Sequence, residues 1–175
     1  RLDIALTSYF HTVDLLNYNW GQGGSGHDQF MGVLRGKDYT RKPSYFAYQS
    51  LCTLLDAQTQ RDRRLDGQMP AAAPDDALSP GFARKGAPLC AYWRPTDLFE
   101  PPAEQSVTLR LPLREGVALE QAVLVDPLSQ EVCAVAPTNQ DATAVTISNL
   151  PLRDYPMIVT DRSALTVERV AERDS

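Results

Sequence analysis

Seven short apolar runs, separated by turn residues, fill the second half of the sequence and constrain its fold more than any other feature. The runs cover residues 82–85, 89–94, 107–113, 122–126, 131–136, 144–148 and 157–161. Within residues 107–111 apolar and polar side chains alternate, as they do in a sheet with one face in water. Runs of this length and spacing are typical of an antiparallel β-sandwich. We therefore predict a mainly β fold with a sandwich of seven to eight strands over residues 81–168.

The residues before the sandwich have a different character. Residues 2–13 are rich in β-branched and aromatic side chains and predict one buried strand. Residues 14–28 contain several asparagines and glycines and predict a long loop. Pro43 suits the first turn of a helix, and apolar residues recur at spacings of three and four up to residue 57. The residues expected on the apolar face of this helix are Tyr45, Tyr48, Leu51, Cys52, Leu54 and Leu55.

Composition suggests where the parts of the chain meet. Residues 59–80 lose the apolar periodicity and include the stretch MPAAAPDD, which is typical of a linker. Residues 167–175 alternate in charge and are expected to form a helical turn or to fray. The predicted organisation is a strand-loop-helix unit over 1–58, a linker over 59–80, a sandwich over 81–168 and a tail over 169–175.

Charge and hydrophobicity exclude two classes of partner. No apolar run approaches the roughly 20 residues that a membrane-spanning helix needs. The formal net charge of -5 opposes binding to nucleic acid, which depends on clustered lysine and arginine. The three cysteines, Cys52, Cys90 and Cys133, lie among apolar neighbours and are expected to be buried thiols. Their spacing fits no zinc site and leaves the cellular compartment open.

Residues 21–26 (GQGGSG) match the glycine pattern of dinucleotide-binding loops. That pattern needs a tight turn from a strand into a helix, and residues 14–20 interrupt it here. The histidines His11 and His27 have carboxylates nearby, Asp14 and Asp28, but this spacing does not force them to converge on a metal. We therefore expect no cofactor and no metal, and nucleotide binding remains only an alternative to be tested.

Polar and aromatic residues gather at the end of the first expected strand. A sugar site needs both kinds, because a pyranose has hydroxyl groups around its rim and C–H groups on its faces. An ordinary junction between a strand and a loop would carry similar residues, so both interpretations stay open. The candidate sugar-binding residues are Tyr9, His11, Asp14, Asn17, Asn19 and Trp20.

Several segments of the sequence resemble segments of a known class of enzymes. Residues 9–14 (YFHTVD), 30–34 (FMGVL) and 41–51 (RKPSYFAYQSL) resemble the last strand and last helix of (β/α)8-barrel glycoside hydrolases. Residues 91–93 (AYW), 125–129 (VDPLS) and 149–156 (NLPLRDYP) resemble the β-sandwich appended to such barrels. The resemblance implies a closing strand-helix unit of a TIM barrel, followed by its supporting sandwich.

The resemblance also implies a function and a deficiency. It predicts the C-terminal portion of an enzyme that acts on glycosidic bonds, with a carbohydrate substrate and an upstream barrel portion of the same protein as its partners. The acid/base and nucleophile carboxylates of these enzymes follow the fourth and seventh barrel strands. Those strands would precede Arg1, which is not an initiator methionine, so we assign no catalytic residue and expect the chain alone to be inactive.

A second class of function is a non-catalytic β-sandwich that binds glycans or another protein. Exposed aromatic side chains on one sheet, such as Tyr92 and Trp93, would support glycan binding. Because these residues lie in a run expected to be a core strand, the sequence favours a structural role for them.

Overall fold

The computed structural model describes residues 12–18, 26–70, 73–96, 105–115, 117–166 and 171–172. The chain forms two compact units, Arg1–Gln49 and Ser50–Ser175. Most of the strand predicted over residues 2–13 lies outside the described residues.

The first unit contains a β-hairpin where the sequence predicts a loop. Strand β1 (Leu15–Tyr18) pairs antiparallel with β2 (His27–Gln29), and Tyr18 lies opposite His27. The prediction of a loop over residues 14–28 is therefore wrong at both ends, because backbone pairing between these ends outweighs their polar composition. Just before the hairpin, Val13 pairs in parallel with Leu34.

Helix α1 (Pro43–Leu54) begins at the predicted proline and ends three residues before the predicted end. Within the helix Leu54 is the buried residue and Leu51 is half-buried; both belong to the second unit and pack against other apolar residues of that unit. Tyr48 and Cys52 are exposed, as is Leu55 just after the helix. The expected apolar face is thus only partly correct, because Leu51 and Leu54 pack whereas these three residues face solvent.

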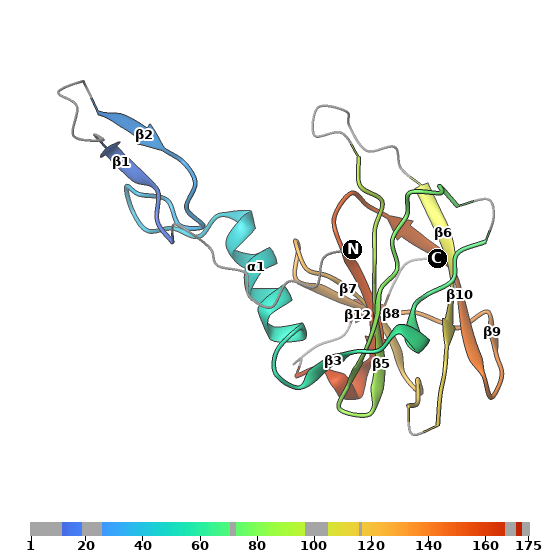
Figure 1. Cartoon of the computed structure of the whole chain (residues 1–175). Coiled ribbons are helices and arrows are strands. Elements are labelled where there is room, and N and C mark those ends of the chain that lie inside the picture. Colours follow the sequence, from blue (N-terminus) through green and yellow to red (C-terminus); the bar gives the residue numbers. More distant parts are fainter. Residues whose placement is uncertain are drawn as a thin grey trace. The chain divides into compact units, whose positions relative to one another are not determined.

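The second unit is a β-sandwich, which confirms the predicted fold class (Figure 1). One sheet has the order β12-β8-β7-β11-β5-β4-β3, and the other has the order β6-β10-β9. The strands are β3 (Thr59–Arg61), β4 (Gly81–Arg84), β5 (Ala87–Tyr92), β6 (Gln105–Pro112), β7 (Ala122–Asp126), β8 (Glu131–Ala134), β9 (Asn139–Gln140), β10 (Ala144–Leu152), β11 (Met157–Asp161) and β12 (Ala171–Glu172). Each of the seven predicted runs overlaps an observed strand, whereas β3, β9 and β12 were not predicted.

The main core lies between the two sheets. It combines residues of β6 and β10 with inward-facing residues of the larger sheet, such as Tyr92, Leu124 and Val159. Residues that alternate with these, including Leu89, Val125 and Ile158, form a second apolar cluster with Leu54. Strand β5 contributes to both clusters, which explains why its run is continuously apolar rather than alternating.

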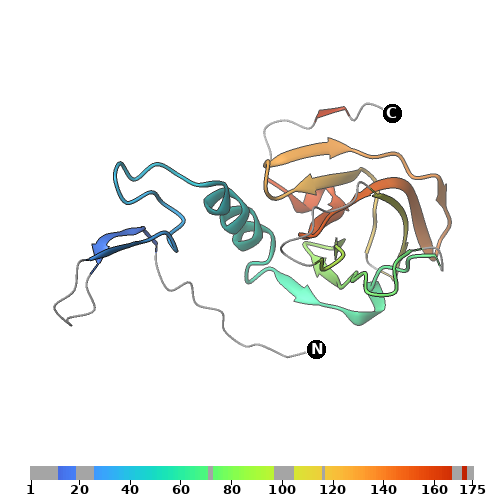
Figure 2. The same ribbon diagram turned by 90° about the horizontal axis from the view of Figure 1, so that it is seen from above.

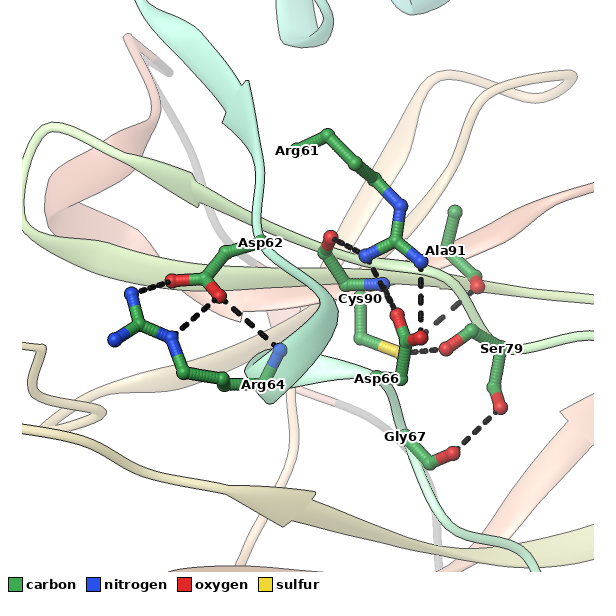
Figure 3. A network of polar contacts seen from close by, with 9 residues as sticks. Arg61, Asp62, Arg64, Asp66, Gly67, Ser79, Cys90 and Ala91 are labelled. Carbon is green, nitrogen blue, oxygen red and sulfur yellow. Dashed lines mark hydrogen bonds and ion pairs between the residues drawn. The ribbon is translucent and has the colours of Figure 1, made fainter. Parts of the chain in front are cut away.

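The segment predicted as a linker contributes to the larger sheet and is tied to it by polar contacts (Figure 3). Arg61 donates a hydrogen bond to the carbonyl of Gly81 (2.6 Å), and Asp66 accepts one from the Gly81 N–H (2.8 Å). Gly67 and Ser79 exchange two further bonds of 2.7 and 2.9 Å. Residues 59–80, which were expected to form a linker, therefore include β3 and the short helix that follows it, held by polar contacts that leave no apolar periodicity in the sequence.

Asp62 anchors the short 3-10 helix η1 (Arg63–Leu65) within the same segment. Its carboxylate accepts a hydrogen bond from Arg64 Nε (3.0 Å) and forms an ion pair with Arg114 Nε (2.7 Å). The hydrogen bond from the Arg64 side chain is the main reason why the pKa of Asp62 falls to about 2. Figure 3 shows Asp62 and Arg64 beside the Arg61–Asp66 pair.

The C-terminal segment and the cysteines both differ from expectation. Residues Ala171–Glu172, predicted as a helical turn or a frayed end, form β12, which pairs in parallel with β8 (red in Figure 2). Of the cysteines, Cys90 is buried as expected, Cys133 is half-buried and Cys52 is exposed, and all three are free thiols. The apolar neighbours of Cys52 do not bury it because it lies off the face of α1 that packs.

Candidate functional site

Asp14 is the best-defined candidate residue in the first unit. It is 6% exposed and lies just before β1. Its Oδ1 accepts a hydrogen bond from the Gly32 N–H (3.0 Å) and lies 2.5 Å from Lys42 Nζ. The same ammonium group donates to the carbonyl of Phe30 (3.2 Å). Asp14 therefore links the end of the first predicted strand, the return through residues 30–34 and the residue that precedes α1.

These contacts hold Asp14 in its ionised form. The hydrogen bond from Lys42 is the main cause that lowers the pKa of Asp14 below its usual value, and burial opposes it. A carboxylate in this state is not suited to act as a general acid near neutral pH. Its contacts instead fix the backbone around it.

Asn17 lies on the hairpin and has a different set of partners. Its backbone adopts a left-handed conformation (φ 49°), and its N–H donates to Asp28 Oδ1 (2.8 Å). Gly26 packs closely here, because a Cβ at this position would lie 2.3 Å from Asn17 Oδ1. Asn17 and Asp28 are both exposed, so an amide and a carboxylate face solvent at the hairpin end. Such groups can bind the hydroxyl groups of a sugar.

The structure describes only part of the predicted site. Asp14 and Asn17 are three positions apart and have different partners: Asp14 is bound by Gly32 and Lys42, whereas the Asn17 N–H binds Asp28. The other four candidates, Tyr9, His11, Asn19 and Trp20, lie outside the described residues.

Sequence reasoning missed Lys42 and did not place Asp28 in the sugar site. Lys42 is 28 positions from Asp14, and no local pattern links residues so far apart. The one signal that pointed to Lys42 was its place before the proline that begins α1. Asp28 becomes a partner of Asn17 only because β1 and β2 pair.

Several apolar side chains are exposed in the first unit. They are Leu16, Tyr18, Phe30, Met31, Tyr39 and Tyr48, and both Phe30 and Tyr39 are 68% exposed. Isolated exposed apolar residues are common on protein surfaces, but the described part of this short unit carries six of them.

The aromatic pair that would support glycan binding on the sandwich is not an exposed platform. Tyr92 is completely buried in the main core, and Trp93 is half-buried against the second cluster. The backbone of Trp93 exchanges two hydrogen bonds with Leu78. Both residues thus have the structural role that the sequence favours.

Two further kinds of site bear on function, a metal site and a membrane-spanning helix. No cluster of histidine, cysteine, aspartate and glutamate there has the arrangement of a metal site. Within the same residues, α1 is too short and too polar to cross a membrane, and no other helix qualifies. Of the glycine-rich motif over 21–26, only Gly26 is described.

Comparison with known proteins supports the fold. No protein-family model matches the sequence, and no curated protein matches it. The chain is similar to the crystal structure of a cycloisomaltooligosaccharide glucanotransferase from a Paenibacillus species, complexed with cycloisomaltoheptaose. The TM-score is 0.51 at 12% sequence identity, over 74% of this chain and 24% of that chain. The chain thus spans about a quarter of the length of that enzyme and shares the fold of that part.

Proposed function

We propose that this chain is the C-terminal portion of an enzyme that acts on glycosidic bonds, either by hydrolysis or by glycosyl transfer. The likeness to the glucanotransferase carries the proposal, since it covers 74% of these residues. The resemblance of residues 9–14, 30–34 and 41–51 to the last barrel unit of glycoside hydrolases supports the same conclusion.

Asp14 and Asn17 have separate roles in this proposal. Asp14 is a positioning residue, because its carboxylate is already bound by Gly32 and Lys42. Asn17 has an exposed side chain on the hairpin and supplies a substrate contact. Tyr9, His11, Asn19 and Trp20 are proposed to contribute to the same substrate site.

The residues that perform the chemistry are proposed to lie outside these 175 residues. Because the likeness covers only 24% of the glucanotransferase, most of that enzyme has no counterpart here. The exposed apolar residues of the first unit, including Phe30 and Tyr39, support contact with further barrel strands and helices. The sandwich is proposed to support the barrel rather than to bind substrate.

The test compares this chain with a longer protein that includes the residues encoded before Arg1. Both are assayed with α- and β-linked aryl glycosides and with cyclic and linear glucans. We expect turnover from the longer protein and none from the 175-residue chain. In the longer protein, Asn17→Ala should raise KM with little change in kcat, because a uniform binding contact is removed.

Lys37→Met is the control, because Lys37 is an exposed residue of the same unit that lies outside β1 and β2, and it should leave KM unchanged. Turnover by the 175-residue chain comparable with that of the longer protein would refute the proposed location of the catalytic carboxylates. Absence of activity on every glycoside by the longer protein would refute the function itself.

A further inference from the structure

An open cavity of about 460 Å³ lies at one end of the sandwich, within the second unit. Three segments line it: the turn between β4 and β5, the residues before β7, and the 3-10 helix η2 (Arg162–Ala164) that follows β11. Cavities of roughly 300–1,000 Å³ are typical of sites for small molecules. The proposed function above makes no use of this region.

Asp161 fixes two of the cavity walls relative to each other. It is 4% exposed, and its Oδ2 accepts hydrogen bonds from the N–H groups of Glu120 and Gln121, both at 2.7 Å. Its Oδ1 accepts a third bond from the Ser163 N–H (2.8 Å). A further bond joins Arg162 N–H to the Gln121 carbonyl (2.9 Å). Both oxygens of the buried carboxylate are therefore hydrogen-bonded to the backbone, and these bonds fix the positions of the two segments that line the cavity.

The third wall is a turn with an unusual residue. Lys85 (φ 50°) and Gly86 (φ 80°) are both left-handed, as a two-residue type I′ turn requires. Asparagine, aspartate or glycine is the usual residue at the first of these positions, and a long side chain there is disfavoured. Strained positions that persist in a structure are often functional. Here the strained residue places a lysine at the cavity.

The exposed side chains around the cavity combine positive charge with hydrogen-bonding groups. Lys85 and Arg162 supply two cations, and Glu120 supplies one carboxylate. The charge of Lys85 also contributes slightly to the lowered pKa of Asp56, but the Asp56 carboxylate is already paired with Arg84. Gln121 and Ser163 add neutral polar groups. The lining therefore holds two cations and two carboxylates, but Asp161 is buried and already accepts three backbone hydrogen bonds. Glu120 is the one exposed carboxylate in this lining, beside the two exposed cations.

We infer that this cavity binds a small polyhydroxylated carboxylate, which is the chemistry of an acidic sugar. Lys85 and Arg162 bind the carboxylate through charge-assisted hydrogen bonds, and Glu120 accepts hydrogen bonds from hydroxyl groups. The described residues of the lining include no aromatic ring, which disfavours a neutral pyranose held by stacking. The two carboxylates of the lining, Glu120 and Asp161, disfavour ligands that carry several negative charges.

The test measures glucuronate binding to the 175-residue chain by titration calorimetry and by shifts of backbone amide signals. We expect saturable binding, with the largest shifts at Glu120, Gln121 and Ser163. Lys85→Asn should weaken binding by about tenfold or more, the loss of one charge-assisted hydrogen bond. This variant should not lower the Tm, because asparagine tolerates the left-handed conformation better than lysine.

Two control variants separate the cavity from general effects. Gln130→Asn makes the same kind of change at another left-handed position (φ 62°), and Arg63→Gln removes an exposed cation elsewhere. Neither should alter glucuronate affinity. The inference is overturned if glucuronate does not bind, if Lys85→Asn binds it as well as the wild type, or if acetate or glucose binds equally well.

Discussion

Lys42 Nζ lies 2.5 Å from Asp14 Oδ1, so the residue before α1 is joined to the residue before β1. Asp14 is almost completely buried, whereas Lys42 is only partly covered. We predict that Lys42→Met lowers the Tm and speeds hydrogen exchange at the Gly32 amide, because Asp14 loses its main partner. Lys37→Met, at an exposed lysine of the same unit, should change neither quantity.

The same pair predicts a dependence of stability on pH. The pKa of Asp14 is lowered in the folded state, so its contribution is present above the unfolded value of 3.8 and is lost as pH falls below it. Thermal melts of the wild type and of Asp14→Asn should therefore converge as the pH is lowered from 6 towards about 3. A difference in Tm that is independent of pH would contradict this assignment.

Gly81→Ala should destabilise the sandwich strongly. A Cβ at residue 81 would lie 1.9 Å from the Leu65 carbonyl oxygen, which is backbone and cannot rotate away. We expect a loss of about 3 kcal/mol or more in the free energy of unfolding by urea. Gly86→Ala, opposed by a positive φ, should lose only about 1 kcal/mol. Equal losses for the two variants would contradict the close approach at Gly81.

The hydroxyl group of Tyr155 should ionise at a higher pH than that of an ordinary tyrosine. Burial is the main cause that raises its pKa to about 12, and the hydrogen bond to Asp126 Oδ2 (3.0 Å) adds to the shift. Because the folded pKa is above the unfolded value of 10.0, this contribution is complete below pH 10 and is lost as pH rises towards 12. Ultraviolet titration of tyrosinate should show a late component that Tyr155→Phe removes. The prediction fails if the titration curve of the variant loses only an early component.

The thiols should react in the order of their exposure. Cys52 is exposed and should react rapidly with a disulfide reagent in the native protein. Cys90 is buried, and burial raises its pKa to about 12, so it should react only after unfolding. Cys52→Ser should abolish the fast phase and leave the denatured total lower by one thiol. A fast phase that survives this substitution would show that another cysteine is accessible.

Sequence patterns predicted the long strands well and the short ones poorly. The alternation in β6 and the continuous apolar run in β5 reflect burial on one face and on two faces, which composition records directly. Strand β3 has the sequence TQR and β12 has two residues, and neither buries enough apolar surface to leave a pattern. They are held by backbone pairing and by contacts such as the Arg61–Asp66 ion pair.

The candidate site was less predictable for a similar reason. Asn17 was identified from its residue type, but its pairing with Asp28 depends on the register of β1 and β2. The cavity beside Lys85 brings together three segments from distant parts of the sequence. Local periodicity carries no information about which turns meet at the end of a sandwich.

Because β11 lies between β5 and β7, the larger sheet cannot form completely until β11 has been synthesised. The β4–β5 and β7–β8 hairpins are synthesised first, and each has an open edge until residues 157–161 emerge to bridge them. Chains that terminate early would expose two unpaired edges, a form prone to self-association. The larger sheet can thus be completed only after residues 157–161 have been synthesised.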